Sequence, residues 1–204
     1  MTLKIYGVAF SRAARALWAA EELGLAYEHI KTPFSGGAPR SPEMLKLNPN
    51  GRIPVIDDDG VVVWESMAIN LYLAKKAGGA LAPKNLVEDG QMTMWSVWAM
   101  TECEKAALQI LFNRVVYPED KRDEKAVQDA MATLRGPLGV LENALKAGGG
   151  QLVGGRFTIA DLNVAAVLSW SRPARELHAD FPGVTAWLKA CLDRPAQKKV
   201  QAMR

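Results

Sequence analysis

Hydrophobic and polar residues change their spacing along the chain at about residue 80. Before that point, short alternating segments such as Leu3–Tyr6 are separated by stretches with helical spacing such as Arg12–Leu23. Alternation at every second residue is typical of a half-buried strand, whereas apolar residues three to four positions apart are typical of a helix. The first 80 residues therefore predict strands and helices that follow one another in alternation.

The remaining elements of this region complete a βαβ unit that is followed by a ββα unit. Further strands are predicted at Leu25–Ile30, Val55–Ile56 and Val61–Trp64. The last two flank Asp57–Gly60, whose composition is typical of a tight turn, and a helix begins at Ser66. Because a βαβ unit makes strands parallel and a tight turn makes them antiparallel, we expect a mixed four-stranded sheet.

Beyond residue 80 the spacing is helical to the end of the chain. Long helices fit Val87–Tyr117 and Glu124–Ala147, and shorter helices follow from Ile159 onward. Strands and helices that are segregated in this way indicate two domains, one α/β and one all-α. We expect the first domain at residues 1–78, a linker at 79–86 and the helical domain at 87–204.

Composition and charge exclude several classes of protein. Of 204 residues, 49% are hydrophobic and 23% are charged, which excludes disorder over most of the chain. The net charge of +3 is spread over both halves, so it gives no argument for nucleic-acid binding. No apolar run approaches the roughly 18 residues of a membrane span, and the N-terminus lacks a signal-peptide profile. We therefore expect a cytoplasmic protein that binds neither membranes nor nucleic acid.

The cysteines and histidines are few and widely spaced. They are Cys103, Cys191, His29 and His178. This spacing fits neither a disulfide framework nor a recognised zinc site. We therefore expect no metal cofactor.

The most informative local segment is Asn48–Ile56, in which Pro54 directly precedes a predicted strand. Proline cannot donate a hydrogen bond to a neighbouring strand, so it marks the start of this one. A cis peptide bond between Ile53 and Pro54 would turn the amide and carbonyl of Ile53 outward, ready to pair with a peptide-like ligand. A trans proline is the alternative, and it is the commoner form when the segment is considered alone.

Glu65 and Ser66 stand between a predicted strand and a predicted helix. The N-terminus of a helix attracts anions, so Ser66 is a candidate to bind a carboxylate while Glu65 binds an ammonium group. Plain capping of the helix is the alternative, and Ser66 taken alone favours it because capping serines are common.

The order of several motifs resembles cytosolic glutathione transferases. Ser11–Arg15, Asn48–Pro54 and Glu65–Ile69 follow one another as in the thioredoxin-like half of that family. Gly155–Asp161 is similar to the capping-box segment of its helical half, and Arg194–Ala196 to its last turn. The resemblance covers nearly the whole chain and suggests a bacterial-type subclass, serine/theta-like or unassigned. It implies an α/β thioredoxin-like N-terminal domain with a mixed four-stranded sheet, and an all-α C-terminal domain.

The resemblance implies a site for glutathione, as co-substrate, at the edge of the first domain. It favours the cis form of Pro54, with Ile53 pairing with the cysteinyl main chain. Glu65 and Ser66 would hold the γ-glutamyl amino and carboxylate groups.

Two arginines complete this implied site. Arg52 would reach the glycyl carboxylate, and Arg40 is a second candidate for the same contact. A tripeptide with two carboxylates suits arginine side chains and a helix N-terminus.

The resemblance also implies that the protein activates the glutathione thiol, because the thiol itself is a poor nucleophile. Ser11 is the first candidate for the activating hydroxyl and Tyr6 is the second, and backbone amides at the start of the first helix are a third possibility. Ser11 as a simple helix cap and Tyr6 as a core residue are the alternatives. The family's serine register points to Val8, which has no hydroxyl, so the subclass stays open.

The second substrate would lie between the domains, against the first long helix of the helical half. The expected pocket residues are Phe10, Trp95, Trp98 and Phe112. Tryptophan and phenylalanine offer an apolar wall to a ligand, and packing in the core or at a dimer interface is the alternative for each of them.

The expected protein is an enzyme, a glutathione S-transferase that conjugates the glutathione thiolate to small hydrophobic electrophiles as a homodimer. Other glutathione-dependent chemistry on the same scaffold is an alternative, namely reduction, dehalogenation or isomerisation. A non-catalytic ligand-binding or regulatory protein is a further alternative, because function is determined by the site and not by the fold.

Overall fold

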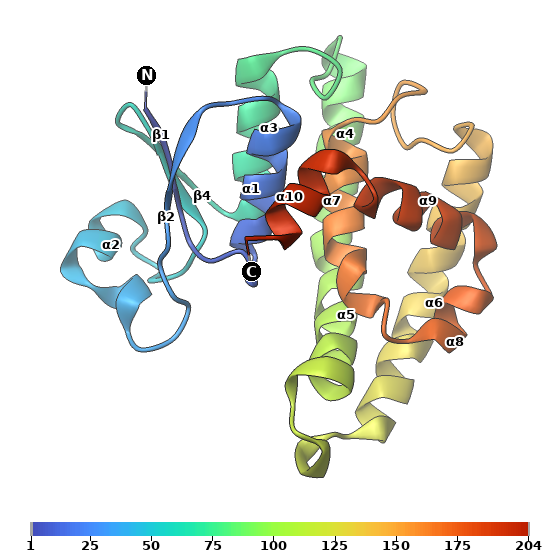
Figure 1. Ribbon diagram of the computed structural model, residues 1–204. Helices are drawn as coiled ribbons and strands as arrows, with labels where there is room; N and C mark the ends of the chain where they lie inside the picture. The colour runs from blue at the N-terminus through green and yellow to red at the C-terminus, as the bar shows by residue number, and fades with distance from the viewer. Residues whose placement is uncertain (1, 204) are drawn as a thin grey trace. The chain divides into compact units, whose positions relative to one another are not determined.

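The computed structural model describes residues 2–203, and the chain divides into two compact units (Figure 1). The first unit comprises Met1–Pro83 and Arg194–Arg204, and the second comprises Lys84–Asp193. Met1 and Arg204, the outer ends of the expected domains, lie outside the described residues. The segment from Arg194 groups with the first unit, although the expected boundaries assign it to the helical domain.

The first unit is built on a four-stranded mixed sheet with the strand order β2-β1-β3-β4. The strands are β1 (Leu3–Tyr6), β2 (Tyr27–Ile30), β3 (Val55–Asp58) and β4 (Val61–Trp64). β1 runs parallel to β2 and antiparallel to β3, and β3 and β4 form a hairpin. The expected mixed sheet is confirmed.

Helices cover both faces of this sheet. They are α1 (Ala13–Glu22), α2 (Pro42–Leu47), α3 (Ser66–Ala77) and the short 3₁₀ helix η1 (Ala38–Arg40). α1 and α3 lie on one face and α2 lies on the other (Figure 1). Leu3 and Ile5 of β1 are buried. They lie on the sheet face toward α1, as shown by Tyr27, the register partner of Leu3, whose hydroxyl donates to Glu21 of α1 at 2.7 Å. Lys4 and Tyr6 alternate with them and face the other side.

The last helix of the chain, α10 (Pro195–Gln201), packs against α1 within the first unit (Figure 1). Arg194 donates two hydrogen bonds to Glu22, at 2.7 and 2.8 Å. Lys199 donates one to Glu21 at 2.7 Å. These charge pairs join residues far apart in the sequence, which is why local periodicity predicts the helix but not its partner.

The second unit is helical, as expected. Its α-helices are α4 (Leu86–Trp98), α5 (Glu104–Leu111), α6 (Glu124–Ala147), α7 (Ile159–Leu168), α8 (Arg175–Ala179) and α9 (Pro182–Leu192). Short 3₁₀ helices are η4 (Glu119–Lys121) and η5 (Ser169–Ser171). Every residue of α7 is buried, which places this helix at the centre of the unit. Within residues 2–203, no helix combines the length and the hydrophobicity that a bilayer span requires.

The single long helix expected at Val87–Tyr117 is interrupted twice. π-Helical segments replace the α-helix at Ala99–Cys103 (η2) and Phe112–Val116 (η3). A π-helix bonds each amide to the carbonyl five residues earlier instead of four. Apolar spacing records which side chains are buried but not this change in bonding, so the pattern predicts one continuous helix.

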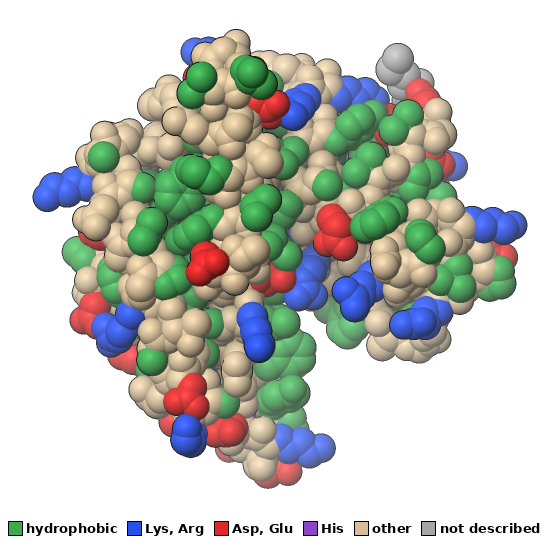
Figure 2. Space-filling view, turned by 180° about the vertical axis from the view of Figure 1, so that it is seen from behind, with side chains coloured by type: hydrophobic (Ala, Val, Ile, Leu, Met, Phe, Trp, Pro, Cys, Tyr) green, Lys and Arg blue, Asp and Glu red, His purple; other side chains and the backbone are tan. Residues whose placement is uncertain are grey.

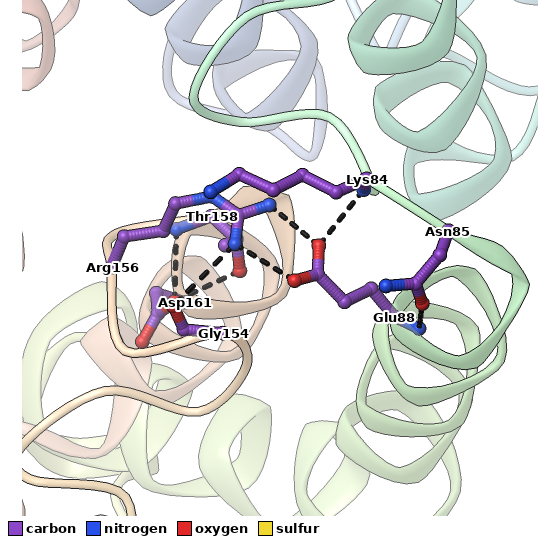
Figure 3. A network of polar contacts seen from close by, with 7 residues as sticks. All are labelled: Lys84, Asn85, Glu88, Gly154, Arg156, Thr158 and Asp161. Carbon is purple, nitrogen blue, oxygen red and sulfur yellow. Dashed lines mark hydrogen bonds and ion pairs between the residues drawn. The ribbon is translucent and has the colours of Figure 1, made fainter.

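A polar network joins the start of α4 to the loop before α7 (Figure 3). Glu88 accepts two hydrogen bonds from the guanidinium of Arg156, at 3.0 and 2.6 Å, and one from the amide of Lys84 at 2.9 Å. These donors lower the pKa of Glu88 to about 2, the Arg156 bonds being the largest cause. The amide of Glu88 in turn donates to the side chain of Asn85, which caps α4.

The same network continues into the capping box that the sequence predicts at Thr158 and Asp161, and the structure confirms this box. The carboxylate of Asp161 is fully buried and accepts hydrogen bonds from the amide and the hydroxyl of Thr158, both at 3.0 Å. It also accepts from the amide of Leu152 at 3.1 Å and from the indole of Trp187 at 3.2 Å. Burial raises the pKa of Asp161, and these donors oppose the shift.

Candidate functional site

The register of the sheet gathers three segments of the first unit at one edge. Tyr6 at the end of β1 pairs with Val55 at the start of β3, and Val55 pairs with Trp64 at the end of β4. The residues that follow β1, precede β3 and follow β4 therefore lie side by side. The three segments are residues 7–12, 51–54 and 65–66.

In the middle segment the peptide bond between Ile53 and Pro54 is cis, as expected. Ile53 is partly exposed and Pro54 is buried. Neither the amide nor the carbonyl of Ile53 makes a hydrogen bond to another residue that the structure describes. These two groups thus remain available to pair with the main chain of a peptide ligand.

The loop ahead of the cis proline is held by Asn48, which the sequence reveals only as part of a motif. Its buried side chain donates to the carbonyl of Arg52 at 2.8 Å and accepts from the amide of Asn50 at 3.0 Å. Gly51 has a φ of +61°, and a Cβ added there would lie 2.8 Å from Cγ of Arg40. Arg52 follows Gly51 in the chain and Arg40 packs against it, so the loop places two cationic side chains beside Gly51. Both arginines are exposed.

The third segment combines a strained residue with a helix N-terminus. Glu65 has φ +70° and ψ +116°, a conformation that residues other than glycine rarely adopt. Such strain is maintained by the surrounding structure and concentrates at ligand sites. Ser66 follows as the first residue of α3 and is only 3% exposed, while the side chain of Glu65 is exposed.

Arg15 of α1 lies at this edge but is not among the predicted site residues. Its side chain is 2% exposed, and Nη1 donates to the hydroxyl oxygen of Ser66 at 3.2 Å. A buried guanidinium and the N-terminus of α3 both favour a negative charge beside Ser66. The sequence does contain a signal for the burial of Arg15. Arg15 lies three and four positions before Trp18 and Ala19, and this spacing places all three residues on the same buried face of α1.

The first segment ends at Ser11, whose hydroxyl is already engaged in two hydrogen bonds. It donates to the carbonyl of Val8 at 2.7 Å and accepts from the amide of Ala13 at 3.1 Å. Ser11 therefore caps the turn that leads into α1. Because a hydroxyl has a single proton, donation to a ligand requires the bond to Val8 to be exchanged.

The other two candidates for activating a thiol differ from Ser11 in their placement. The amides of Ser11 and Ala14 donate to the carbonyls of Val8 and Ser11, at 3.0 and 3.1 Å, and the Ala13 amide is held by the Ser11 hydroxyl. These amides are therefore directed to internal acceptors. Tyr6 alternates with Ile5 along β1, so its ring projects from the sheet face opposite the one that α1 covers.

Two aromatic rings are exposed on the first unit beside this loop. Phe10 is 61% exposed and meets the 57% exposed Phe34 edge-on, with ring centroids 5.4 Å apart. Phe34 is not among the predicted residues because it lies in a loop without periodicity. The pair offers an apolar surface next to Ser11.

The other expected pocket residues belong to the second unit. Trp95 of α4 is buried, and it meets the partly exposed Trp98 edge-on at 5.0 Å. Phe112, also partly exposed, lies 5.2 Å from the ring of Tyr117. An acceptor pocket that includes these residues stays a prediction.

Two family models match the chain. The model for the glutathione S-transferase N-terminal domain matches residues 1–75, and the model for the C-terminal domain matches residues 104–195. Glutathione S-transferase 1 from Zea mays is 32% identical over 98% of this chain and 96% of its own length. Glutathione S-transferase 1 from Triticum aestivum is 29% identical, over 97% and 93%. Both relatives are plant proteins, so they do not support the expected bacterial-type, serine/theta-like subclass.

Solved structures agree with these matches. Glutathione S-transferase-I bound with the ligand lactoylglutathione has a TM-score of 0.89 and 30% identity, and the match covers 99% of each chain. Ure2p in complex with glutathione has a TM-score of 0.83 and 27% identity, covering 98% of this chain and 94% of Ure2p. The fold is therefore shared along nearly its full length with proteins whose structures contain glutathione or a derivative.

Proposed function

The chain belongs to the glutathione S-transferase family, and on that premise we propose that it conjugates the glutathione thiolate to small hydrophobic electrophiles. The observation that carries the proposal is the sheet edge described above. It combines the available main-chain groups of Ile53, the buried pair of Arg15 and Ser66, and the hydroxyl of Ser11. Each of these matches a different group of the tripeptide.

The γ-glutamyl end of glutathione suits the third segment. Its carboxylate would bind at Ser66 and the N-terminus of α3, with Arg15 as the buried counter-charge. Its ammonium group would bind the exposed carboxylate of Glu65. The strained backbone of Glu65 supports this role, because its side chain makes no hydrogen bond that caps the helix.

The rest of the tripeptide suits the middle segment. The cysteinyl main chain would pair with the amide and carbonyl of Ile53, ahead of the cis Pro54. The glycyl carboxylate would reach Arg52 or Arg40, which the loop brings to the same glycine. Arginine is suited to this contact because its planar fork binds carboxylates through two hydrogen bonds.

Ser11 is the proposed activating residue. Lowering the pKa of a thiol by two units requires about 2.7 kcal/mol. A hydrogen bond to a charged acceptor contributes about 1.5–3 kcal/mol, and a helix N-terminus adds about 0.3–1 kcal/mol. Exchanging the bond to Val8 costs about 1 kcal/mol, so the hydroxyl and the helix together supply most of what is needed. The thiolate sulfur then forms a bond to the electrophilic carbon, and the displaced electron pair leaves with the substrate's leaving group.

A homodimer in the cytoplasm is part of the same proposal. The α4 residues Leu86, Val87, Met94 and Val97 are between 54% and 86% exposed, and helical geometry places them within an arc of about 100°. Apolar side chains also reach the surface elsewhere on both units (Figure 2). A row of this kind is typical of an interface. Light scattering is expected to give twice the chain mass of 22.2 kDa, and a monomer would contradict the dimer.

One observation favours a second candidate, a glutathione-binding protein without turnover. The Ser11 hydroxyl is directed to Val8 and is therefore not poised to donate. Binding to immobilised glutathione, followed by conjugation of a general electrophile, separates the two candidates. We expect both binding and conjugation. Binding without conjugation at any pH would favour the glutathione-binding protein without turnover, and the absence of binding would contradict the glutathione site itself.

A substitution pair tests the activating residue. Ser11→Ala is expected to raise the pKa of the bound thiol by about one unit, the share that the hydroxyl supplies, measured from thiolate absorbance against pH. Tyr6→Phe is the comparison, since it removes the hydroxyl of the second candidate, at the end of β1. A shift produced by Tyr6→Phe instead would transfer the role to Tyr6.

A further inference from the structure

We propose that His29 is a positioning residue for Ser11. It holds the carbonyl of Gly7 and so orients the loop that carries the Ser11 hydroxyl. The inference rests on the proposed function, in which that hydroxyl activates the bound thiol. In this role His29 acts through the main chain and does not touch the substrate.

The contact itself is well defined. Nε2 of His29 lies 2.8 Å from the carbonyl oxygen of Gly7. A carbonyl oxygen only accepts, so Nε2 carries the proton and donates, and in the neutral ring Nδ1 is the unprotonated nitrogen. His29 is on β2 opposite Ile5 of β1, so its ring reaches across to the point where the chain leaves β1.

Gly7 is the residue at which this part of the chain changes direction. Its φ is +138°, and a Cβ added there would lie 2.5 Å from Cβ of Ala13, at the start of α1. The amide of Gly7 donates to the carbonyl of Ile30 at 3.0 Å. Two adjacent residues of β2, His29 and Ile30, therefore hold both polar groups of a residue that has no side chain to fix its conformation.

The loop transmits this restraint to Ser11. The carbonyl of Gly7 and the amide of Val8 belong to one rigid peptide plane. The carbonyl of Val8 accepts from both the amide and the hydroxyl of Ser11, at 3.0 and 2.7 Å. A rotation of the Gly7–Val8 peptide would therefore move the acceptor that holds the Ser11 hydroxyl. We expect loss of the His29 bond to change the direction of the hydroxyl more than the stability of the unit.

The same strand provides a matched control. Tyr27 lies two residues before His29 on the same face of β2, and its hydroxyl donates to Glu21 near the C-terminal end of α1. Tyr27→Phe thus removes a side-chain hydrogen bond from β2 without affecting the loop of Gly7. It separates a specific effect on Ser11 from a general loosening of the strand.

The test compares His29→Phe with His29→Gln, which keeps an N–H donor at a similar reach. We expect His29→Phe to raise the pKa of bound glutathione by about one unit, read from thiolate absorbance. We also expect kcat near neutral pH to fall about three- to fivefold as the thiolate fraction falls, with less than a twofold change in the KM for glutathione. His29→Gln should recover most of both quantities, and Tyr27→Phe should change neither. If His29→Phe does not fold, His29→Leu removes the donor with a smaller side chain and should give the same shift.

A double substitution separates this inference from the proposed function. In the Ser11→Ala background, His29→Phe should change the thiol pKa by less than about 0.3 unit and kcat by less than twofold, because the hydroxyl that His29 positions is absent. If Ser11→Ala alone leaves the thiol pKa unchanged, the proposed role of Ser11 fails. If Ser11→Ala raises the pKa but His29→Phe does not, only the positioning role fails. Equal effects of His29→Phe and His29→Gln would also overturn it, because the donor would then be irrelevant.

Discussion

Two polar clusters, one in each unit, contain similar residues but differ in how far their hydrogen-bonding groups are paired. Around Asp161 and Glu88 of the second unit, carboxylates, amides and a guanidinium satisfy one another through short hydrogen bonds (Figure 3). At the sheet edge of the first unit, the main-chain groups of Ile53 have no partner among the described residues, and Glu65 is strained and exposed. We call the first arrangement the closed network, because its polar groups bond to one another, and the second the open cluster, because some of its polar groups have no partner among the described residues.

The contrast shows that residue type alone does not distinguish a folding role from a binding role. Buried polar groups must be hydrogen-bonded, and a closed network meets this requirement internally. A binding site instead leaves some donors and acceptors for its ligand. The hydrogen bonds therefore indicate a folding role for Asp161, and the unpaired main-chain groups of Ile53 support its proposed binding role. Substitutions in the two clusters should accordingly affect different quantities.

The largest expected effect belongs to the closed network. Asp161→Ala leaves the amide and hydroxyl of Thr158, the amide of Leu152 and the indole of Trp187 without their acceptor. We expect the free energy of unfolding to fall by about 3–5 kcal/mol, measured by urea denaturation. Asp129→Ala, at an exposed carboxylate of the same unit, is the control and should change it by less than about 0.5 kcal/mol. A decrease in the free energy of unfolding of less than about 1 kcal/mol for Asp161→Ala would contradict the view that these groups depend on one another for their hydrogen bonds.

Ser66→Ala tests the open cluster. It removes the hydroxyl that Arg15 contacts and that a ligand carboxylate would share. We expect the KM for glutathione to rise about tenfold, equivalent to about 1.4 kcal/mol, with a smaller change in kcat. Ser169→Ala, whose hydroxyl bonds only within its own turn in the second unit, is the control. An unchanged KM would remove Ser66 from the site.

Features that depend on neighbouring residues could be predicted from the sequence. α6 begins and ends where its periodicity predicts, and the β3–β4 hairpin follows its turn residues. Helical spacing near the C-terminus predicts α10, but the pairing of α10 with α1 depends on Arg194 meeting Glu22. Such long-range contacts leave no local pattern, and the π-helical segments likewise change hydrogen bonding without changing apolar spacing.

The candidate site divides in the same way. Ile53, Pro54 and Ser66 lie in local motifs, and the sheet register then brings those motifs together. Asn48 and His29 act on main-chain carbonyls of other segments, and no pattern of side chains indicates which carbonyl each one reaches. Supporting residues of this kind become visible only when the hydrogen bonds are known.

The closed network also predicts a dependence on pH. The hydrogen bonds from Arg156, together with that from the Lys84 amide, lower the pKa of Glu88 from its ordinary value of 4.5 to about 2 in the folded protein. The carboxylate therefore stabilises the fold fully above about pH 5, and this contribution is lost as the pH falls from about 4.5 toward 2. The difference in unfolding free energy between the protein and Glu88→Gln should narrow over that range. It should vary less with pH in an Arg156→Met background, where only the Lys84 donor still lowers the pKa of Glu88, and a difference that stays constant down to pH 3 would contradict the pairing.

The smallest expected effect is at the tether between α10 and α1. Arg194 makes two hydrogen bonds to Glu22, but its side chain is 35% exposed, so solvent weakens the pair. We expect Arg194→Ala to lower the free energy of unfolding by about 0.5–1 kcal/mol, measured by urea denaturation, and to leave the KM for glutathione unchanged. Lys189→Ala, which removes an exposed pair with Asp193 at the C-terminal end of α9, should have an effect near zero. A rise in the KM with Arg194→Ala would show that the position of α1 at the open cluster depends on α10, and the two ends of α1 could then no longer be treated as independent.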